Sequence, residues 1–213
     1  MNGQFADEYC ESAVTEIETL ILMKAWEVIK KQDDINVLRS TWAFKLKRYP
    51  DGLIKKFKAC FCAWVDIQLE GINFFEMYAP VVQWTTARLM LILEVLLGLK
   101  SKQDNVTAAF LHANLGEDEK VFVDMPWGFK VKGQNDTNKV LKLKNMRYGL
   151  RQSPRSFWKY MSFKMELCGM VQSKMDPSLF IGKKESDGHH FCNNLLILAG
   201  IGMLKKNMTL EVN

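Results

Sequence analysis

Disulfide pairs, a secretory leader and a membrane-length apolar run are not evident in this 213-residue chain. Its five cysteines are odd in number and form no Cys-x-x-Cys pair, which argues against a disulfide framework and favours a reducing compartment. The first residues are polar and acidic, unlike a signal peptide. The longest apolar run, residues 89–99, includes Glu94 and Gly98 and is too short to cross a bilayer. We therefore expect an intracellular protein, cytoplasmic or nuclear, without a membrane partner.

The charge balance of the chain is slightly basic. The formal net charge is +5 and the pI is near 8.9, which permits a polyanionic partner without requiring one. Hydrophobic residues make up 48% and charged residues 25%, which is ordinary for a globular protein. The length is enough for one large domain or for two small lobes that share a core. We find no internal repeat and no low-complexity segment.

A β-hairpin is predicted over residues 40–63. Residues 40–48 alternate apolar and polar side chains, residues 49–52 (Tyr-Pro-Asp-Gly) form a turn signal, and residues 53–63 give the return strand. Its basic side chains allow two interpretations, an ordinary solvated strand face or a two-stranded finger that lies over phosphates. The lysines that would supply this charge are Lys45, Lys47, Lys56 and Lys58.

Three helices are predicted from apolar periodicity and end signals. The first runs from Asp7, as its cap, to about residue 23. The second runs over residues 87–97, capped by Thr85 or Thr86 and ended by Gly98. The third begins at Ser153 and Pro154 and ends before Gly169. The apolar face of the first helix comprises Ala13, Val14, Ile17, Leu20 and Ile21, with Glu11, Glu16 and Glu18 mostly outside.

The start of the third helix carries a candidate anion site. Arg151 and Arg155 flank a helix amino terminus, where exposed amide groups and arginines together suit an anion. A plain capped surface helix is the alternative interpretation.

Two further segments hold the candidate catalytic positions. Residues 101–111 are predicted as a short strand and a turn that leads into a helical turn at residues 108–110. Residues 189–198 are predicted as a hairpin with Asn193 and Asn194 at its turn. Taken alone, both segments favour an ordinary strand and an ordinary hairpin over catalytic positions. Short strands are also predicted at residues 25–29, 121–123, 140–143 and within 173–181, with loops at residues 30–39 and 183–188 and a polar tail at the end.

Together these segments resemble the reverse transcriptase of copia-type retrotransposons, in a partial and degenerate form. The resemblance covers nearly all of residues 8–200, in the order and at the spacing of the family. Its most specific pieces are residues 41–63, 75–88, 106–115, 148–155 (YGLRQSPR) and 173–181.

The resemblance implies an α+β fold with the fingers and palm of a right-hand polymerase, in which an antiparallel palm sheet packs on helices. It further implies no thumb, because only a short tail follows residue 200, and a weak grip on duplex. The implied divisions are 1–40 (amino-terminal helix and lead-in), 41–84 (fingers, basic hairpin), 85–116 (palm), 117–147 (fingers), 148–200 (palm) and 201–213 (tail).

The resemblance also implies a chemistry that this sequence departs from. The family holds two divalent ions, Mg²⁺ or Mn²⁺, with three aspartates while it copies an RNA template from a DNA primer. Asn105, Asn193 and Asn194 stand at these three positions. An amide brings no charge, so productive metal binding is not expected. Asp104 is a poor substitute, because one step along a strand places it on the opposite face.

Other family positions are partly kept. Cys60 stands where an arginine contacts the incoming triphosphate, whereas Lys58 fits the basic strand. Phe110 lies at the position of an aromatic that excludes a ribose 2′-hydroxyl, and Gln152 at that of a glutamine in the nucleotide pocket. Arg151 and Arg155 could meet template or primer phosphates. Trp64 and Trp127 stand where the family usually has arginine, and Asn73 stands where it usually has aspartate. A single-base transition in the codon can explain each of these changes. We therefore infer a decayed copy of a retrotransposon.

Three functional hypotheses remain open from the sequence. The first is a fragment of a retrotransposon polymerase, within a Pol polyprotein, that is catalytically inactive. The second is a nucleic-acid-binding remnant without polymerase activity, and the third is an inert product. A soft-metal site at His189, His190 and Cys192 is disfavoured, because only three ligands crowd on one strand.

Overall fold

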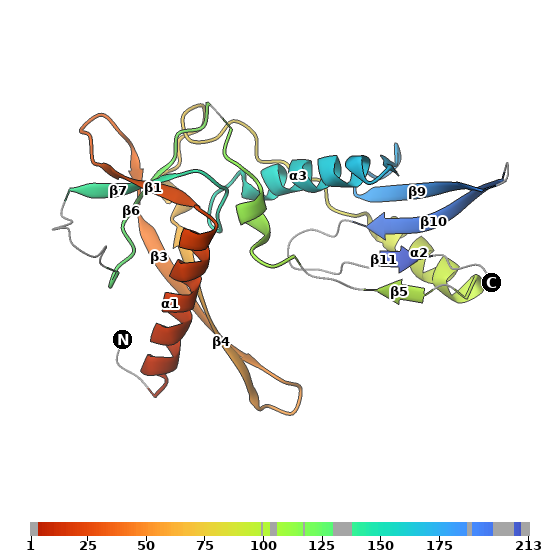
Figure 1. The fold of residues 1–213 in the computed structure, drawn as a ribbon, viewed down its shortest axis with the longest axis horizontal. Helices are drawn as coiled ribbons and strands as arrows, with labels where there is room; N and C mark the ends of the chain where they lie inside the picture. The colour runs from red at the N-terminus through yellow and green to blue at the C-terminus, as the bar shows by residue number, and fades with distance from the viewer. Residues whose placement is uncertain are drawn as a thin grey trace. The chain divides into compact units, whose positions relative to one another are not determined.

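The computed structural model describes residues 4–98, 100–102, 106–116, 118–129, 138–186, 189–197 and 207–209. For Val65, for residues 100–102 and from residue 183 onward, only the backbone is described. The fold is mixed α/β (Figure 1). It divides into two compact units, each built from two stretches of chain. The first unit comprises residues 1–76 and 110–153, and the second comprises residues 77–109 and 154–213.

The first unit contains the predicted hairpin, which is confirmed. Strands β3 (Ser40–Arg48) and β4 (Ile54–Ala63) pair in antiparallel fashion. The turn between them is closed by Asp51 Oδ1, which accepts a hydrogen bond from the Leu53 amide at 2.9 Å. Gly52 takes a φ of +87°, a conformation that glycine adopts without steric cost. Local turn chemistry therefore sets the hairpin register.

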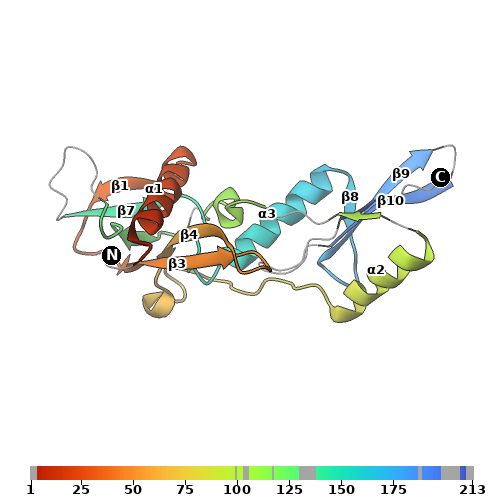
Figure 2. The ribbon, with the colours of Figure 1, turned by 90° about the horizontal axis from the view of Figure 1, so that it is seen from below.

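Helix α1 (Ala6–Leu22) lies along this hairpin (Figures 1 and 2). Tyr9 packs edge-on against Phe44 and Phe57, with ring centroids 5.3 and 5.1 Å apart. The predicted start at Asp7 is wrong, because Phe5 is the N-cap residue and Asp7 lies in the first turn. Ile17 and Leu20 are buried as predicted.

The predicted faces of α1 need two corrections. Val14 and Ile21 are 51% and 54% exposed, although the apolar periodicity placed them in the core. Glu16 is half-buried rather than outside. The helix contacts one narrow hairpin, so the stripe that it buries is narrower than its apolar face.

A four-stranded sheet completes the first unit. Its order is β1 (Trp26–Lys30), β7 (Lys139–Leu143), β6 (Phe122–Asp124), β2 (Val37–Leu38). Only the β2–β6 pair is parallel. Strand β2 corrects the prediction that residues 30–39 are all loop. The buried side chains include Leu38, Val121, Val123, Val140 and Leu141. Two short 3-10 helices occur along the chain: η1 (Val65–Ile67) follows β4, and η2 (Ala109–His112) precedes β6.

The second unit combines two helices with an antiparallel sheet. Helix α2 (Trp84–Leu96) begins after Gln83 rather than at Thr85 or Thr86, so the predicted cap is wrong. The Gln83 amide instead donates to Asp176 Oδ2 at 3.0 Å. Helix α3 (Ser153–Leu167) starts where predicted. The left-handed residues that follow the helices, Gly98 and Gly169, confirm both predicted helix ends.

The sheet of the second unit corrects three predictions. Its order is β5 (Lys100–Lys102), β11 (Asn207–Thr209), β10 (His189–Ile197), β9 (Leu179–Ser186), β8 (Met170–Gln172). Strand β9 extends through most of the predicted loop at 183–188, and β11 lies in the predicted tail. Asn193 and Asn194 lie inside β10, where its register with β9 shifts, and not at a turn.

Candidate nucleic-acid and nucleotide interface

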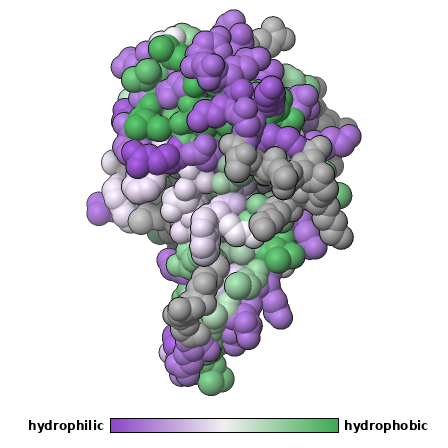
Figure 3. Space-filling model, turned by 90° about the vertical axis from the view of Figure 1, so that its left-hand side faces the viewer, coloured by the Kyte–Doolittle hydropathy of each residue, from purple (hydrophilic) through white to green (hydrophobic). Residues whose placement is uncertain are grey.

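The lysines of the β3–β4 hairpin face one another in pairs. The register sets Lys45 opposite Lys58 and Lys47 opposite Lys56. Because side chains alternate along a strand, all four lie on one face, and Phe44 and Phe57 lie on the other face, against α1. Directly opposed like charges destabilise a hairpin, by about 0.2–1 kcal/mol per pair. We call this set of four lysines the lysine face. Figure 3 shows hydrophilic and hydrophobic side chains mixed at the bottom of that view, where Figure 1 places the hairpin's turn end and the start of α1.

The inner end of the lysine face meets two aromatic rings. Lys58 Nζ lies 5.5 Å from the ring centroid of Tyr148, a cation–π contact. The Tyr148 ring packs edge-on against Phe110, with centroids 4.7 Å apart. The structure therefore brings together Lys58 and Phe110, two predicted nucleotide-binding residues. Tyr148 links them and was not predicted, although it lies within the YGLRQSPR motif.

Gly149 explains why Tyr148 lies at this position. Its φ is +94°, and a Cβ added there would collide with the Ala63 carbonyl oxygen and lie 3.1 Å from the Ala63 carbonyl carbon. The Ala63 amide also donates to the Tyr148 carbonyl oxygen at 3.2 Å. The end of β4 and the Tyr148–Gly149 backbone thus lie in close contact, which only glycine permits.

Gln152 lies in a buried amide network. Its side chain is 1% exposed, its Nε2 donates to the Asn73 carbonyl oxygen at 2.7 Å, and its Oε1 accepts from Gln68 Nε2 at 3.1 Å. Gln68 Oε1 in turn accepts the Arg151 amide hydrogen at 3.0 Å. The network positions Arg151, whose guanidinium lies 5.4 Å from the Phe74 ring centroid. The predicted nucleotide contact of Gln152 stays a prediction.

The start of α3 is built differently from a simple capped helix. Ser153 Oγ donates to the Arg147 carbonyl oxygen at 2.6 Å and accepts from the Arg147 amide at 3.2 Å. Its hydroxyl therefore fixes the preceding loop instead of capping a free helix amide. Arg155 Nη1 donates to the Tyr78 carbonyl oxygen at 2.9 Å. The anion site that we predicted at this helix start stays a prediction.

Cys60, at the position of the family arginine, is half-buried on β4. Burial raises the pKa of its thiol, although the neighbouring Lys58 opposes the shift. Burial also raises the pKa of Cys62 to about 11. Both thiols are therefore neutral at neutral pH, and Cys60 adds no charge to the lysine face.

A buried arginine lies next to these thiols in the first unit. Arg147 is 2% exposed, and its guanidinium lies over the rings of Phe61 and Trp26, 4.6 and 4.9 Å from their centroids. Burial lowers its pKa to about 10, so it remains charged at neutral pH. Glu16 supplies the opposing charge; burial raises the pKa of Glu16, and Arg147 partly offsets this. Neither role was predicted, because each depends on contacts between distant segments.

The predicted catalytic positions lie mostly outside what the structure describes. Asn105 and Asp104 fall outside the described residues, and only the backbone of Asn193 and Asn194 is described. The side chains of His189, His190 and Cys192 are likewise not described. In the described part of the chain, no three His, Cys, Asp or Glu side chains cluster as a metal site would require. Within that same part, no helix has the length and apolarity needed to cross a membrane.

Comparison with known proteins identifies a family. A model of the family described as reverse transcriptase (RNA-dependent DNA polymerase) matches residues 23–198. The Retrovirus-related Pol polyprotein from transposon TNT 1-94 of Nicotiana tabacum is 33% identical over 86% of this chain and 13% of its own length. That from transposon RE1 of Arabidopsis thaliana is 30% identical over 82% of this chain and 12% of its own length. The Transposon Ty1-JR1 Gag-Pol polyprotein of Saccharomyces cerevisiae is 28% identical over 78% of this chain and 9% of its own length.

The chain thus spans about an eighth or less of the length of these curated relatives. No solved structure matches it significantly. The matched residues include the hairpin that carries the lysine face and Tyr148 of the YGLRQSPR motif, which lies at its inner end. This chain belongs to the reverse transcriptase (RNA-dependent DNA polymerase) family, as a partial domain of the type found in the Pol polyproteins of copia-like retrotransposons.

Proposed function

We propose that this chain is a fingers-and-palm segment that binds a nucleic-acid strand through the lysine face and does not add nucleotides. The observation that carries the binding is the direct opposition of Lys45 to Lys58 and of Lys47 to Lys56. Four amines held on one side of a two-stranded ribbon repel one another, and a line of phosphates relieves that repulsion. The partners that suit this charge are the family's RNA template and DNA primer.

Aromatic rings at the inner end of the lysine face support the same proposal. Tyr148 and Phe110 lie beside Lys58, and rings next to cations suit a nucleotide base and its phosphate together. Arg151 is exposed at the rim of the Gln152 network and adds a further cation within the same unit. Binding through these groups needs no metal ion.

The division into two units supports the assignment of fingers and palm. The first unit holds the hairpin and the sheet that includes β6 and β7, which the proposal assigns to the fingers. The second unit holds α2, most of α3 and the antiparallel sheet, which the proposal assigns to the palm. Each unit is made of two stretches, as the proposed order of fingers and palm segments requires.

The lack of nucleotide addition follows from the donor set. Polymerisation needs two divalent ions, and magnesium prefers carboxylate oxygens that offset its charge. Asn105, Asn193 and Asn194 offer neutral amide oxygens, so this donor set does not fit a pair of Mg²⁺ or Mn²⁺ ions. The neutral Cys60 thiol also leaves the triphosphate without the arginine that the family uses. No step of polymerisation is therefore assigned to this chain.

Two measurements on the full chain test the proposal. Primer extension on an RNA template, with Mg²⁺ and then Mn²⁺, is expected to give no product. Extension that disappears in Asn105→Ala would overturn the proposed inactivity. Filter binding of an RNA–DNA hybrid is expected to weaken steeply as salt rises. Binding that is absent, or that does not depend on salt, would overturn the proposed nucleic-acid role and leave the inert-product hypothesis.

A further inference from the structure

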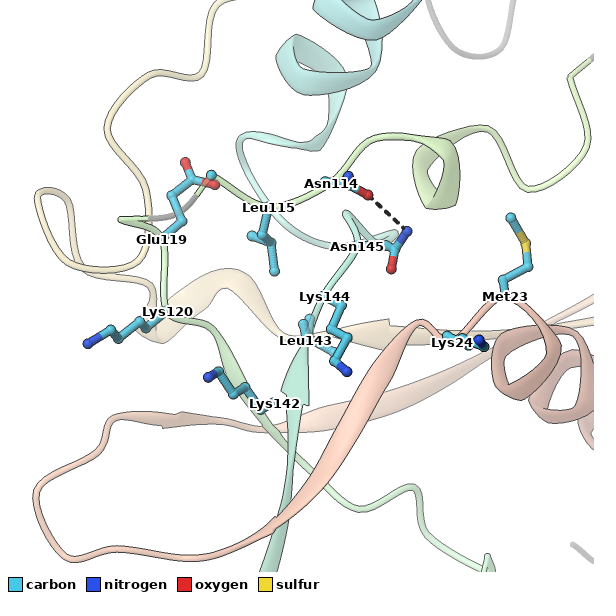
Figure 4. A pocket seen from close by; sticks show the side chains of 11 residues that line it. Met23, Lys24, Asn114, Leu115, Glu119, Lys120, Lys142, Leu143, Lys144 and Asn145 are labelled. Atoms are coloured by element: carbon cyan, nitrogen blue, oxygen red, sulfur yellow. Dashed lines mark hydrogen bonds between the residues drawn. The ribbon is translucent and has the colours of Figure 1, made fainter.

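A hollow of about 520 Å³ lies in the first unit, apart from the lysine face. Three segments form its wall: the end of α1, the loop before β6, and the end of β7 (Figure 4). Its volume falls in the range of small-molecule sites, which is roughly 300–1,000 Å³. Its lining residues are Met23, Lys24, Asn114, Leu115, Gly116, Glu119, Lys120, Lys142, Leu143, Lys144 and Asn145.

Lysines dominate the charge of this wall. Lys142 and Lys144 are two positions apart at the end of β7, and the Leu143 amide between them donates to the Val121 carbonyl oxygen at 2.9 Å. That bond sets Lys120, the residue before Val121, beside the same end of β7. Lys24 adds a fourth amine from the end of α1. Lys144 also meets Glu27 at 3.5 Å, in an exposed pair that holds the amine only weakly.

Part of the wall is held in place by hydrogen bonds. Asn145 Nδ2 donates to the Leu111 carbonyl oxygen at 2.7 Å and to Asn114 Oδ1 at 3.4 Å, and the latter bond is drawn in Figure 4. Lys24 has a φ of +51°, a conformation that costs a non-glycine residue about 1–2 kcal/mol. The chain thus keeps a lysine at a helix end where glycine would fit with less strain.

Glu119 narrows the kind of ligand that fits. Its Oε2 atom is buried and has no hydrogen-bond partner in the described structure. Glu119 as a whole is only half-buried and lines the hollow, so a ligand that offers a hydroxyl or amino group to its carboxylate would be favoured. A bare phosphate satisfies the lysines and is repelled by Glu119. A nucleotide carries phosphate for the lysines and donor groups on its sugar or base.

We propose that this hollow binds a nucleotide unit, with Lys120, Lys142 and Lys144 on its phosphate and Glu119 on a sugar or base donor. The unit comes either from a free nucleotide or from one position of a bound strand, and both offer the same chemistry. The inference goes beyond the proposed function, because no residue of the lysine face lines the hollow.

Equilibrium binding without divalent metal tests the site on the full chain. The probes are adenosine triphosphate, inorganic tripolyphosphate and a short RNA–DNA hybrid. In Lys142→Gln/Lys144→Gln, adenosine triphosphate is expected to bind about tenfold more weakly or worse. Lys31→Gln/Lys174→Gln removes the same charge at two exposed positions outside the hollow, and it is expected to bind as the unaltered chain does. Thermal melting confirms that both variants are folded.

The outcomes separate the two sources of the nucleotide. Loss of adenosine triphosphate binding in the Lys142/Lys144 variant supports a free nucleotide. If adenosine triphosphate does not bind at all, a fall of about two in the salt slope for the hybrid supports a strand position. No change with any probe overturns the inference. In that case, hybrid binding that still depends on Lys45 and Lys47 leaves the proposed function intact.

Glu119→Gln tests the second half of the proposal. Removing the carboxylate is expected to strengthen tripolyphosphate binding, because a repelling charge is removed, while adenosine triphosphate binding weakens by about threefold to tenfold. Equal strengthening of both probes would show that Glu119 only repels phosphate. That result would overturn its role as an acceptor for the nucleotide.

Discussion

The lysine face and the lysine-lined hollow are both basic and both lie in the first unit, yet they are built differently. The lysine face lies on one side of a two-stranded ribbon, and its amines oppose one another in pairs. The hollow is concave, and it carries Glu119 among its lysines. An open row of cations accepts any polyanion, whereas a hollow that carries a carboxylate among its lysines favours a ligand that also donates hydrogen bonds. Charge of one sign would therefore serve two kinds of recognition in one unit.

Gly149→Ala should give the largest effect, because it separates Tyr148 from the lysine face. The added Cβ collides with the Ala63 carbonyl group, and the alanine must also adopt a left-handed φ. We therefore expect the free energy of unfolding to fall by about 3 kcal/mol or more. Gly128→Ala is the matched control, because its φ is +82° but nothing lies within 4 Å, and about 1 kcal/mol is expected there. Urea unfolding of both variants measures the difference. Equal decreases would contradict a close contact at Ala63.

Lys45→Gln/Lys47→Gln should weaken hybrid binding and leave the hollow unaffected. Removing one lysine–phosphate pair lowers the salt slope by about 0.9, so a fall of nearly two is expected for the double variant. The same change removes one member of each opposed lysine pair, so the hairpin should become slightly more stable. Hybrid binding across a salt series and thermal melting check the two effects. A variant that is both less stable and weaker in binding would indicate that these lysines have a structural role.

Cys60→Arg should strengthen hybrid binding at the lysine face, whereas Lys45→Gln/Lys47→Gln weakens it. The substitution replaces a neutral thiol beside Lys58 by a permanent cation on the same face of β4, so the salt slope for the hybrid should rise by about one. Adenosine triphosphate binding at the hollow should not change, because Cys60 does not line it. Cys60→Gln provides the neutral control of comparable length. A slope that is unchanged in Cys60→Arg would place this position outside the strand path.

The pH dependence of ligand binding should differ between the lysine face and the hollow, because Glu16 acts on the lysine face and does not line the hollow. Burial raises the pKa of Glu16 above 4.5, so its contribution to folding stability is present below that pH and is lost as pH rises through the folded pKa. Its carboxylate also acts on Lys58 and Lys56 and does not line the hollow. We expect hybrid affinity to fall over this pH range relative to Glu16→Gln. Parallel pH profiles for the two proteins would refute this link.

Lys24→Gly should give the smallest effect. Glycine relieves the left-handed strain at the end of α1, so stability should rise by about 1 kcal/mol. Nucleotide binding at the hollow should weaken, because one of its lysines is removed. Lys24→Asn is a useful comparison, since asparagine also tolerates this backbone conformation. A gain in stability without any weakening of binding would remove Lys24 from the site.

The hairpin and the helix ends could be predicted from the sequence because their signals are local. The turn at residues 49–52 and the glycines at 98 and 169 act on their own neighbours. The partners of Gln152 lie 79 and 84 positions away, so no spacing rule could predict its burial. The hollow was missed for the same reason, because its lysines come from three segments that look ordinary one by one. The turn predicted at Asn193 and Asn194 was wrong, because the polar pair lies within strand β10, which pairs on both sides.

The pairing of β1 with β7 has a consequence for how the chain is made. Strand β1 must wait for a partner that leaves the ribosome about a hundred residues later, which takes about 5–20 s at common synthesis rates. During that interval its unpaired edge is open to other chains. We expect the nascent protein to depend on chaperones at this stage, and truncations that end before residue 139 to aggregate during expression.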